Sequence, residues 1–78
     1  EGELEIIEVK ILDDSKCIGK TLKDIALAGV FLVLLIKPSG SDDYLIPGGN
    51  TELNLGDTLV IISHTEKSRV VMENFGVA

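Results

Sequence analysis

Residues 44–63 contain two short apolar segments around two glycine turns, and this stretch constrains the fold most strongly. The second turn, Leu55-Gly56-Asp57, leads directly into the strand-like run 58–62. Glycine adopts a positive φ that costs other residues about 1 kcal/mol or more, and an aspartate beside it can hydrogen-bond its own backbone. We therefore expect a strand, a turn and a second strand, with the turn fixing where the last strand begins.

The content of apolar residues predicts one small domain with an aliphatic core. The chain has 78 residues, of which 45% are hydrophobic and 4% are aromatic. A domain of this size buries only about 60% of the surface that its unfolded chain exposes, so its stability on its own is modest. Because small monomers rarely expose large apolar patches, we expect part of the hydrophobic surface to lie in a homodimer interface.

Charge and cysteine content argue against several classes of function. The formal net charge is -6 and the pI is near 4.5. This charge opposes direct nucleic acid binding by the domain and opposes contact with an anionic membrane surface. Cys17 is the single cysteine, so the chain has neither a disulfide framework nor a CxxC metal pair. The absence of a disulfide framework and of a CxxC pair fits a reducing compartment, and we expect a cytoplasmic location.

The first residues of the chain are typical of a fragment of a longer protein. The sequence begins at Glu1 without the basic segment and cleavage site of a signal peptide. The apolar run 25–36 is too short to cross a bilayer as a helix, which needs about 20 residues. We expect residues 1–78 to form a single domain cut from a larger protein.

Periodicity and turn residues predict a small α+β domain with a mainly antiparallel sheet and two helices. The expected elements are strands at about 3–11, 30–36, 44–46 and 57–63, a short helix at 21–27 and a final helix ending at Phe75. The alternation of the first strand slips at Ile7, which indicates a bulge or twist near its middle. The order of elements is therefore βαβββα.

Short motifs mark the ends of both helices. Thr21-Leu22-Lys23-Asp24 has the form of a capping box with aspartate in place of glutamate. Gly29 is well placed to end the first helix. Ser63 or Thr65 is expected to cap the final helix, and Gly76 to end it.

The strand expected near 30–36 is apolar throughout. An antiparallel sheet normally leaves one face in contact with water, and its strands then alternate between apolar and polar residues. A fully apolar strand therefore indicates that both faces are covered. We expect a helix on one face and another helix or a second subunit on the other.

No group of residues forms a catalytic or metal-binding constellation, and we expect a protein that is not an enzyme. Gly19-Lys20-Thr21 matches the end of a phosphate-binding loop, but Asp14 stands where the first glycine belongs and would repel phosphate. Cys17 lacks a nearby histidine or a run of positive charge to activate its thiol. The acidic pairs at 13–14 and 42–43 are typical of solvated turns rather than of a cation site.

Three residues are candidates for ligand binding: Lys37, Asn50 and His64. His64 follows the last strand, which is a common position for binding residues, although a histidine beside a turn is more often solvated or helix-capping. Lys37 ends the apolar strand and is the obvious cationic donor for a phosphate group. Asn50 ends the turn that begins at Pro47.

Taken in order, the motifs of the chain resemble the TrkA-C domain, also called the RCK-C domain. The residues that carry the resemblance are Ile18-Gly19-Lys20-Thr21-Leu22, 31–36, Ile46-Pro47, Thr51, Leu53, Gly56-Asp57 and 59–61. The ordered set with its spacing is fairly specific and covers nearly all of the chain. The resemblance implies a cytoplasmic, usually dimeric regulatory domain of βαβββα type that is attached to something larger.

The resemblance implies regulation of ion transport. Family members commonly follow a Rossmann-like nucleotide-binding domain in regulators of potassium channels and transporters, and they also occur within antiporters and permeases or beside helix-turn-helix domains. The implied function is therefore a homodimeric, ligand-sensing domain whose partner is a membrane channel or transporter. The alternative is a ligand-free dimerisation module in a permease, an antiporter or a transcription regulator.

The resemblance also bears on cofactors and ligands. The chain has no GxGxxG pattern, so we expect no cofactor here and place any NAD or ATP site in a neighbouring domain. Some members bind cyclic di-AMP across the dimer through an Asp-x-Arg pair and an asparagine, and these positions fall near Ala26, Ala28 and Leu32. All three polar residues are thus replaced, which argues against cyclic di-AMP as the ligand and leaves another small molecule or nucleotide open.

Overall fold

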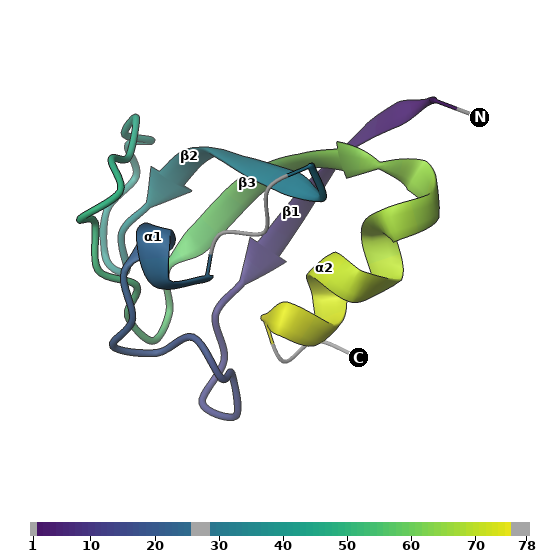
Figure 1. Ribbon diagram of the computed structural model, residues 1–78. Coiled ribbons are helices and arrows are strands. Elements are labelled where there is room, and N and C mark those ends of the chain that lie inside the picture. The colour runs from purple at the N-terminus through teal and green to yellow at the C-terminus, as the bar shows by residue number, and fades with distance from the viewer. Residues whose placement is uncertain (1, 26–28, 76–78) are drawn as a thin grey trace.

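The computed structural model describes residues 2–25 and 29–75, which form a three-stranded sheet and two helices. The elements are β1 (Leu4–Lys10), α1 (Leu22–Ile25), β2 (Phe31–Lys37), β3 (Thr58–His64), the 3-10 helix η1 (Thr65–Lys67) and α2 (Ser68–Asn74). The strands are antiparallel with β3 in the centre, and α1 and α2 lie on the same side of the sheet (Figure 1). This architecture confirms the α+β class. Neither described helix has the length and apolar character needed to cross a membrane.

The core lies between the sheet and the two helices. Ile7 of β1 is opposite Ile61 of β3, and both are buried. Phe75 follows α2, is fully buried and meets the ring of Phe31 edge to face, with 5.7 Å between the ring centroids. The buried apolar residues are Ile7, Val9, Ile11, Cys17, Ile36, Leu53, Leu59, Ile61, Val71 and Phe75. The core is therefore mainly aliphatic, as the composition predicts.

The outer face of the sheet is the side that faces away from both helices. The strand register and the alternation of side chains assign to it Leu4, Ile6, Glu8 and Lys10 of β1, Leu32, Leu35 and Lys37 of β2, and Thr58, Val60, Ile62 and His64 of β3. The sequence predicts that a helix covers one face of the apolar strand, and α1 and α2 lie on that side of β2 (Figure 1). The described residues place no helix over the outer face, so a second subunit remains the expected cover there.

The apolar pair at the middle of β1 is not a bulge. β1 pairs with β3 without a register shift from Leu4 to Lys10. Ile6 and Ile7 are both apolar because they point to opposite faces of the sheet and both faces carry apolar side chains. The irregularity lies in β2 instead, between Val33 and Leu35.

The short strand predicted at 44–46 is reduced to an isolated bridge. Leu45 and Ile36 exchange two backbone hydrogen bonds, with N to O distances of 2.9 and 2.7 Å. Pro47 has no N–H to donate, so the pairing cannot continue along the edge of β2.

The final helix begins as η1, and its predicted side-chain cap is not formed. The hydroxyl of Ser63 donates to the carbonyl oxygen of His64 at 3.2 Å, and that of Thr65 donates to the carbonyl oxygen of Glu3 at 3.4 Å. Glu3, the residue before β1, thus supplies the acceptor for the hydroxyl of Thr65 in place of the helix end. The predicted helix ends at residues 26–27 and at Gly76 lie outside the described residues.

The turn before β3 has the predicted backbone. Gly56 has a φ of +89°, and the carboxylate of Asp57 is buried. This carboxylate accepts the N–H of Asn54 at 2.9 Å, which is the expected local bond. Its other oxygen accepts the N–H of Ser39 at 2.9 Å and joins the turn to the loop after β2.

Gly56→Val is expected to lower the free energy of unfolding by at least about 1 kcal/mol, because a β-branched residue resists a positive φ. A Cβ atom at this position would also lie 2.6 Å from the Oγ atom of Ser39. Gly40→Val is the matched control, since Gly40 has a φ of +82° but a Cβ atom there meets no described atom within 4 Å. Thermal denaturation should show the larger loss for Gly56→Val. An unchanged melting temperature for Gly56→Val would mean that the turn is misread, and equal losses in the two variants would mean that the contact with Ser39 adds no cost.

The start of α1 confirms part of the capping box. The carboxylate of Asp24 accepts the N–H of Thr21 at 3.0 Å and the hydroxyl of Thr21 at 2.8 Å. The backbone hydrogen bond, followed by the hydroxyl bond, holds the pKa of Asp24 below its usual value of 3.8. Both bonds favour the ionised carboxylate.

This lowered pKa predicts a small acid-side loss of stability. Because the folded-state pKa of Asp24 is the lower one, its contribution is complete above the unfolded-state pKa of about 4 and is lost as the pH falls through the folded-state value. Asp24→Asn should remove that contribution. Urea denaturation at a series of pH values below about 6 should therefore show a steeper acid-side decline for the native chain than for the variant. Two parallel curves would contradict the assignment.

Candidate functional site

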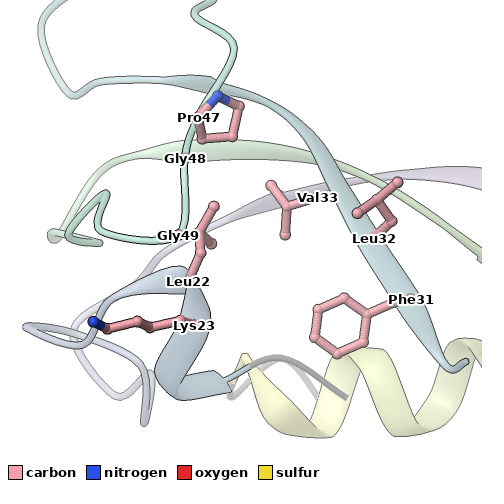
Figure 2. Close-up of a pocket in the computed structure, with 8 residues that line it drawn as sticks. All are labelled: Leu22, Lys23, Phe31, Leu32, Val33, Pro47, Gly48 and Gly49. Atoms are coloured by element: carbon pink, nitrogen blue, oxygen red, sulfur yellow. The ribbon is translucent and has the colours of Figure 1, made fainter. Parts of the chain in front are cut away.

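A shallow pocket of about 230 Å³ lies beside β2, at the edge of the sheet. Its lining residues are Leu22 and Lys23 of α1, Phe31, Leu32 and Val33 of β2, and Pro47, Gly48 and Gly49 of the loop that follows the isolated bridge. Figure 2 shows the two α1 residues on one side of the pocket, the three β2 residues on the other and the loop closing the remaining side. Three segments that are distant in sequence thus meet at one place.

Backbone hydrogen bonds hold α1 against the loop. The N–H of Lys23 donates to the carbonyl oxygen of Gly49 at 3.0 Å, and the N–H of Leu22 donates to that of Thr51 at 3.1 Å. The hydroxyl oxygen of Thr51 accepts the N–H of Gly48 at 2.9 Å. These bonds satisfy N–H groups at the start of the helix, which have no partner within the helix itself. The wall of the pocket is therefore fixed by the same contacts that cap α1.

The chemistry of the pocket suits binding rather than catalysis. Its walls are mostly apolar, and Lys23 is the charged residue among those that line it. In Figure 2 the ammonium group of Lys23 points away from Phe31 and Val33, so the charge stands at the rim. Among the described residues, the lining includes no carboxylate, histidine or thiol that could transfer a proton or attack a substrate. The arrangement can accept a flat apolar group and place a cation near an attached anion.

The described part of the chain shows no metal centre either. Within residues 2–25 and 29–75, no group of three or more histidine, cysteine, aspartate or glutamate residues could hold a metal ion. Cys17 is buried, and its Sγ atom lies 3.0 Å from the Oγ atom of Ser15. The acidic pairs considered in the sequence carry exposed side chains in loops.

The structure does not bring the three candidate ligand residues together. Lys37 ends β2 opposite Thr58, and its ammonium group lies 5.4 Å from the ring centroid of Tyr44. His64 ends β3 six residues beyond Thr58, which is about 20 Å along a strand. Its Nδ1 atom is buried and has no hydrogen-bond partner among the described residues. Asn50 is exposed directly after Gly49, next to the pocket but not in its lining.

The pocket residues were missed because their common position depends on tertiary structure. Leu22 and Lys23 were considered only as parts of sequence motifs, not as binding residues. A usable signal was the pair of glycines after Pro47, since glycines allow a backbone to approach closely. A Cβ atom at Gly49 would lie 3.6 Å from the Cβ atom of Lys23. Of the three positions tied to cyclic di-AMP in the family, Leu32 lines the pocket, and the other two lie outside the described residues.

Comparison with protein families shows which family this chain belongs to. The family model of the TrkA-C domain matches residues 6–76, which is nearly the whole chain. The chain belongs to the TrkA-C domain family. A related protein, the Trk system potassium uptake protein TrkA homolog of Archaeoglobus fulgidus, is 33% identical over 75 residues. That match covers 96% of this TrkA-C domain and 17% of the archaeal protein, so the domain spans about one sixth of its relative's length.

Solved structures share the fold of this TrkA-C domain. The RCK C domain of the potassium transport protein KtrA, in complex with cyclic di-AMP, is 26% identical with a TM-score of 0.76, and the match covers 94% of this chain and 85% of that one. The RCK_C domain dimer of S. agalactiae BusR, also in complex with cyclic di-AMP, is 16% identical with a TM-score of 0.78, over 94% and 97% of the two chains. The second likeness concerns the fold alone.

Proposed function

We propose that this TrkA-C domain is a non-catalytic, homodimeric module that senses a small ligand and regulates a potassium or other ion transport system. The observation that carries this proposal is the match over 96% of the chain to a potassium uptake protein. The pocket beside β2 supports it, because the described lining is mostly apolar and suits the binding of a small molecule. We expect the domain to act in the cytoplasm, attached to a larger protein, with any NAD or ATP site in a neighbouring domain.

The pocket is the proposed ligand site. Apolar walls at Phe31, Val33 and Pro47 suit stacking against a planar heterocycle, and Lys23 at the rim suits an anionic group attached to it. The KtrA relative, whose structure contains cyclic di-AMP, makes that compound the first to test. The alanines at 26 and 28 and the leucine at 32 argue for a weaker or different ligand of the same chemical class.

Regulation follows if the ligand distinguishes two arrangements of the dimer. A ligand shifts an equilibrium between conformations only by the difference of its affinities for them. A compound held in the pocket and in contact with a second subunit would favour one arrangement of the subunits. The favoured arrangement of the subunits would in turn change the activity of the attached channel or carrier.

A thermal-shift screen of the chain tests the sensing function. The panel contains cyclic dinucleotides, adenine and guanine nucleotides, and monovalent and divalent cations. A ligand at about 100 times its dissociation constant should add about 2.7 kcal/mol, which is a rise of several degrees for a small domain. A flat panel would favour the second candidate, a ligand-free dimerisation module, which the three replaced polar positions support.

Charge reversal at the rim locates any anionic ligand found in the screen. Lys23→Glu is expected to weaken its binding several-fold, because the pocket's rim cation becomes an anion. Lys20→Glu is the matched control, since Lys20 is an exposed lysine of the same segment that does not line the pocket. Isothermal titration of both variants measures the effect. Equal weakening in both would place the ligand elsewhere.

A further inference from the structure

We propose that residues 44–49 form a strap that couples the pocket beside β2 to the outer face of the sheet. At one end of the strap Tyr44 is latched across the outer face, and at the other end the strap is a wall of the pocket. Displacement of the wall releases the latch, and release of the latch loosens the wall. The inference rests on the proposed function in that it names how occupancy of the pocket is transmitted through the domain.

The latch lies across the outer face. The hydroxyl of Tyr44 donates to the Oε2 atom of Glu8 on β1 at 2.8 Å, and the ammonium group of Lys37 on β2 lies 5.4 Å from the centroid of the Tyr44 ring. Since β3 runs between those two strands, the ring crosses the outer face near Val60, the partner of Glu8. Val60 is half-buried, whereas Ile6 on the same face is 64% exposed. The latched tyrosine therefore covers this part of the outer face.

The other end of the strap forms part of the pocket. Pro47, Gly48 and Gly49 line the pocket, and in Figure 2 they close the side that α1 and β2 leave open. The carbonyl oxygen of Gly49 accepts the N–H of Lys23 at 3.0 Å, and the N–H of Gly48 donates to the hydroxyl oxygen of Thr51 at 2.9 Å. A compound that occupies the pocket contacts this wall directly.

The middle of the strap is stiff and is hinged on β2. Leu45 and Ile36 exchange two backbone hydrogen bonds. Proline fixes its own φ and restricts the residue before it to an extended backbone, which here applies to Pro47 and Ile46. Tyr44 and Pro47 are three residues apart, which is about 10 Å of extended chain. Displacement of the wall therefore turns the strap about Leu45 and moves Tyr44, because the chain between them cannot easily absorb it.

The latch can open and close because it is a single contact at the surface. Tyr44 is 41% exposed, and Glu8 is exposed as well. The hydrogen bond to Glu8 favours the protonated phenol and raises the pKa of Tyr44 above its usual value of 10.0. The chain has one tyrosine and no tryptophan, so the absorbance of the phenolate reports on Tyr44 alone.

Tyr44→Phe removes the hydrogen bond of the latch and tests whether the wall responds. The amide of Lys23, which is bonded to Gly49, should exchange with solvent at least about fivefold faster in the variant, because one hydrogen bond contributes an amount of that order. The amide of Asn54, which is bonded to Asp57 in the turn before β3, is the reference and should exchange at the native rate. An unchanged rate at Lys23 would overturn the coupling. Equal acceleration at both amides would also overturn it, because it would reflect a general loss of stability.

Gly49→Val tests the coupling in the opposite direction. A Cβ atom at Gly49 would lie 3.6 Å from the Cβ atom of Lys23, so the methyl groups of valine should push the wall away from α1. Gly48→Val is the matched control, since a Cβ atom there meets no described atom within 4 Å. Spectrophotometric titration should show a pKa of Tyr44 that is lowered toward 10.0 in Gly49→Val and in Glu8→Gln, and that stays raised in Gly48→Val.

Three outcomes of the titration would overturn the inference. A raised pKa of Tyr44 in Glu8→Gln would remove the latch, and a raised pKa in Gly49→Val beside a lowered one in Glu8→Gln would remove the coupling. Equal lowering in both glycine variants would show that the contact with Lys23 is not what moves the strap. Neither the exchange rates nor the titration needs a ligand. Their failure would therefore leave the sensing function standing, and a flat ligand panel would leave the strap standing.

Discussion

Phe75→Ala is expected to lower the free energy of unfolding by about 3–5 kcal/mol, which is the usual cost of removing a buried phenylalanine. Phe75 is fully buried and packs edge to face on Phe31. A chain of 78 residues is expected to have a total stability of about 4–12 kcal/mol. The variant should therefore lose a large share of its stability, and urea denaturation measures the loss.

Val70→Ala provides the control on the same helix. Val70 lies in α2 and is 38% exposed, so its truncation removes little buried surface. We expect a change below about 1 kcal/mol. Similar midpoints for the two variants would contradict the position of α2 against the sheet.

Asp57→Ala is expected to cost about 3 kcal/mol or more, since hydrogen bonds to a charged group contribute roughly 1.5–3 kcal/mol each. The substitution leaves the N–H groups of Ser39 and Asn54 without the carboxylate that accepts them, each at 2.9 Å. Asp57→Asn keeps one acceptor oxygen and should lie between the variant and the native chain. Urea denaturation gives the order of the three proteins.

Hydrogen exchange shows whether the loss arises from those two bonds. The amides of Ser39 and Asn54 should exchange faster in Asp57→Ala, even under conditions where the protein remains folded. Asp42→Ala is the control, because Asp42 is an exposed aspartate in the loop after β2. If both aspartate variants lowered stability equally, the buried carboxylate would not be what joins the loop to the turn.

Features governed by local chemistry were predictable from the sequence. The positive φ of Gly56 follows from a glycine between an apolar segment and an aspartate, and the hydrogen bonds of Thr21 follow from the Thr-x-x-Asp spacing. The family relationship also followed, because it rests on an ordered set of such motifs. In each case the residues that interact are close in sequence.

Features governed by pairing between distant segments were not predictable. The apolar pair Ile6-Ile7 suggested a bulge, because the sequence does not show that both faces of β1 carry apolar groups. The hydrogen bond that the N–H of Ser39 donates to Asp57 depends on how the loop after β2 folds back. The predicted strand at 44–46 stops at one bridge because Pro47 follows it.

In the candidate site too, local features were predictable from the sequence and contacts between distant segments were not. Lys37, Asn50 and His64 were selected for their chemistry at strand and turn ends, and the structure places them apart and outside the lining of the pocket. The pocket is defined by α1, β2 and the loop after the bridge, whose contact is made through backbone hydrogen bonds such as that from Lys23 to Gly49. The spacing of residues along the sequence does not predict backbone hydrogen bonds between distant segments. The role of the three candidates in binding stays a prediction.

The mass of the native chain, measured by sedimentation equilibrium up to high micromolar concentration, tests most directly whether this TrkA-C domain is a dimeric regulatory module. We expect a species of twice the 8.4 kDa of the single chain, because the proposed function requires a dimer and the domain exposes several large apolar side chains that a second copy can cover. A single species of 8.4 kDa across the whole range would contradict the dimer and, with it, the proposed mode of regulation.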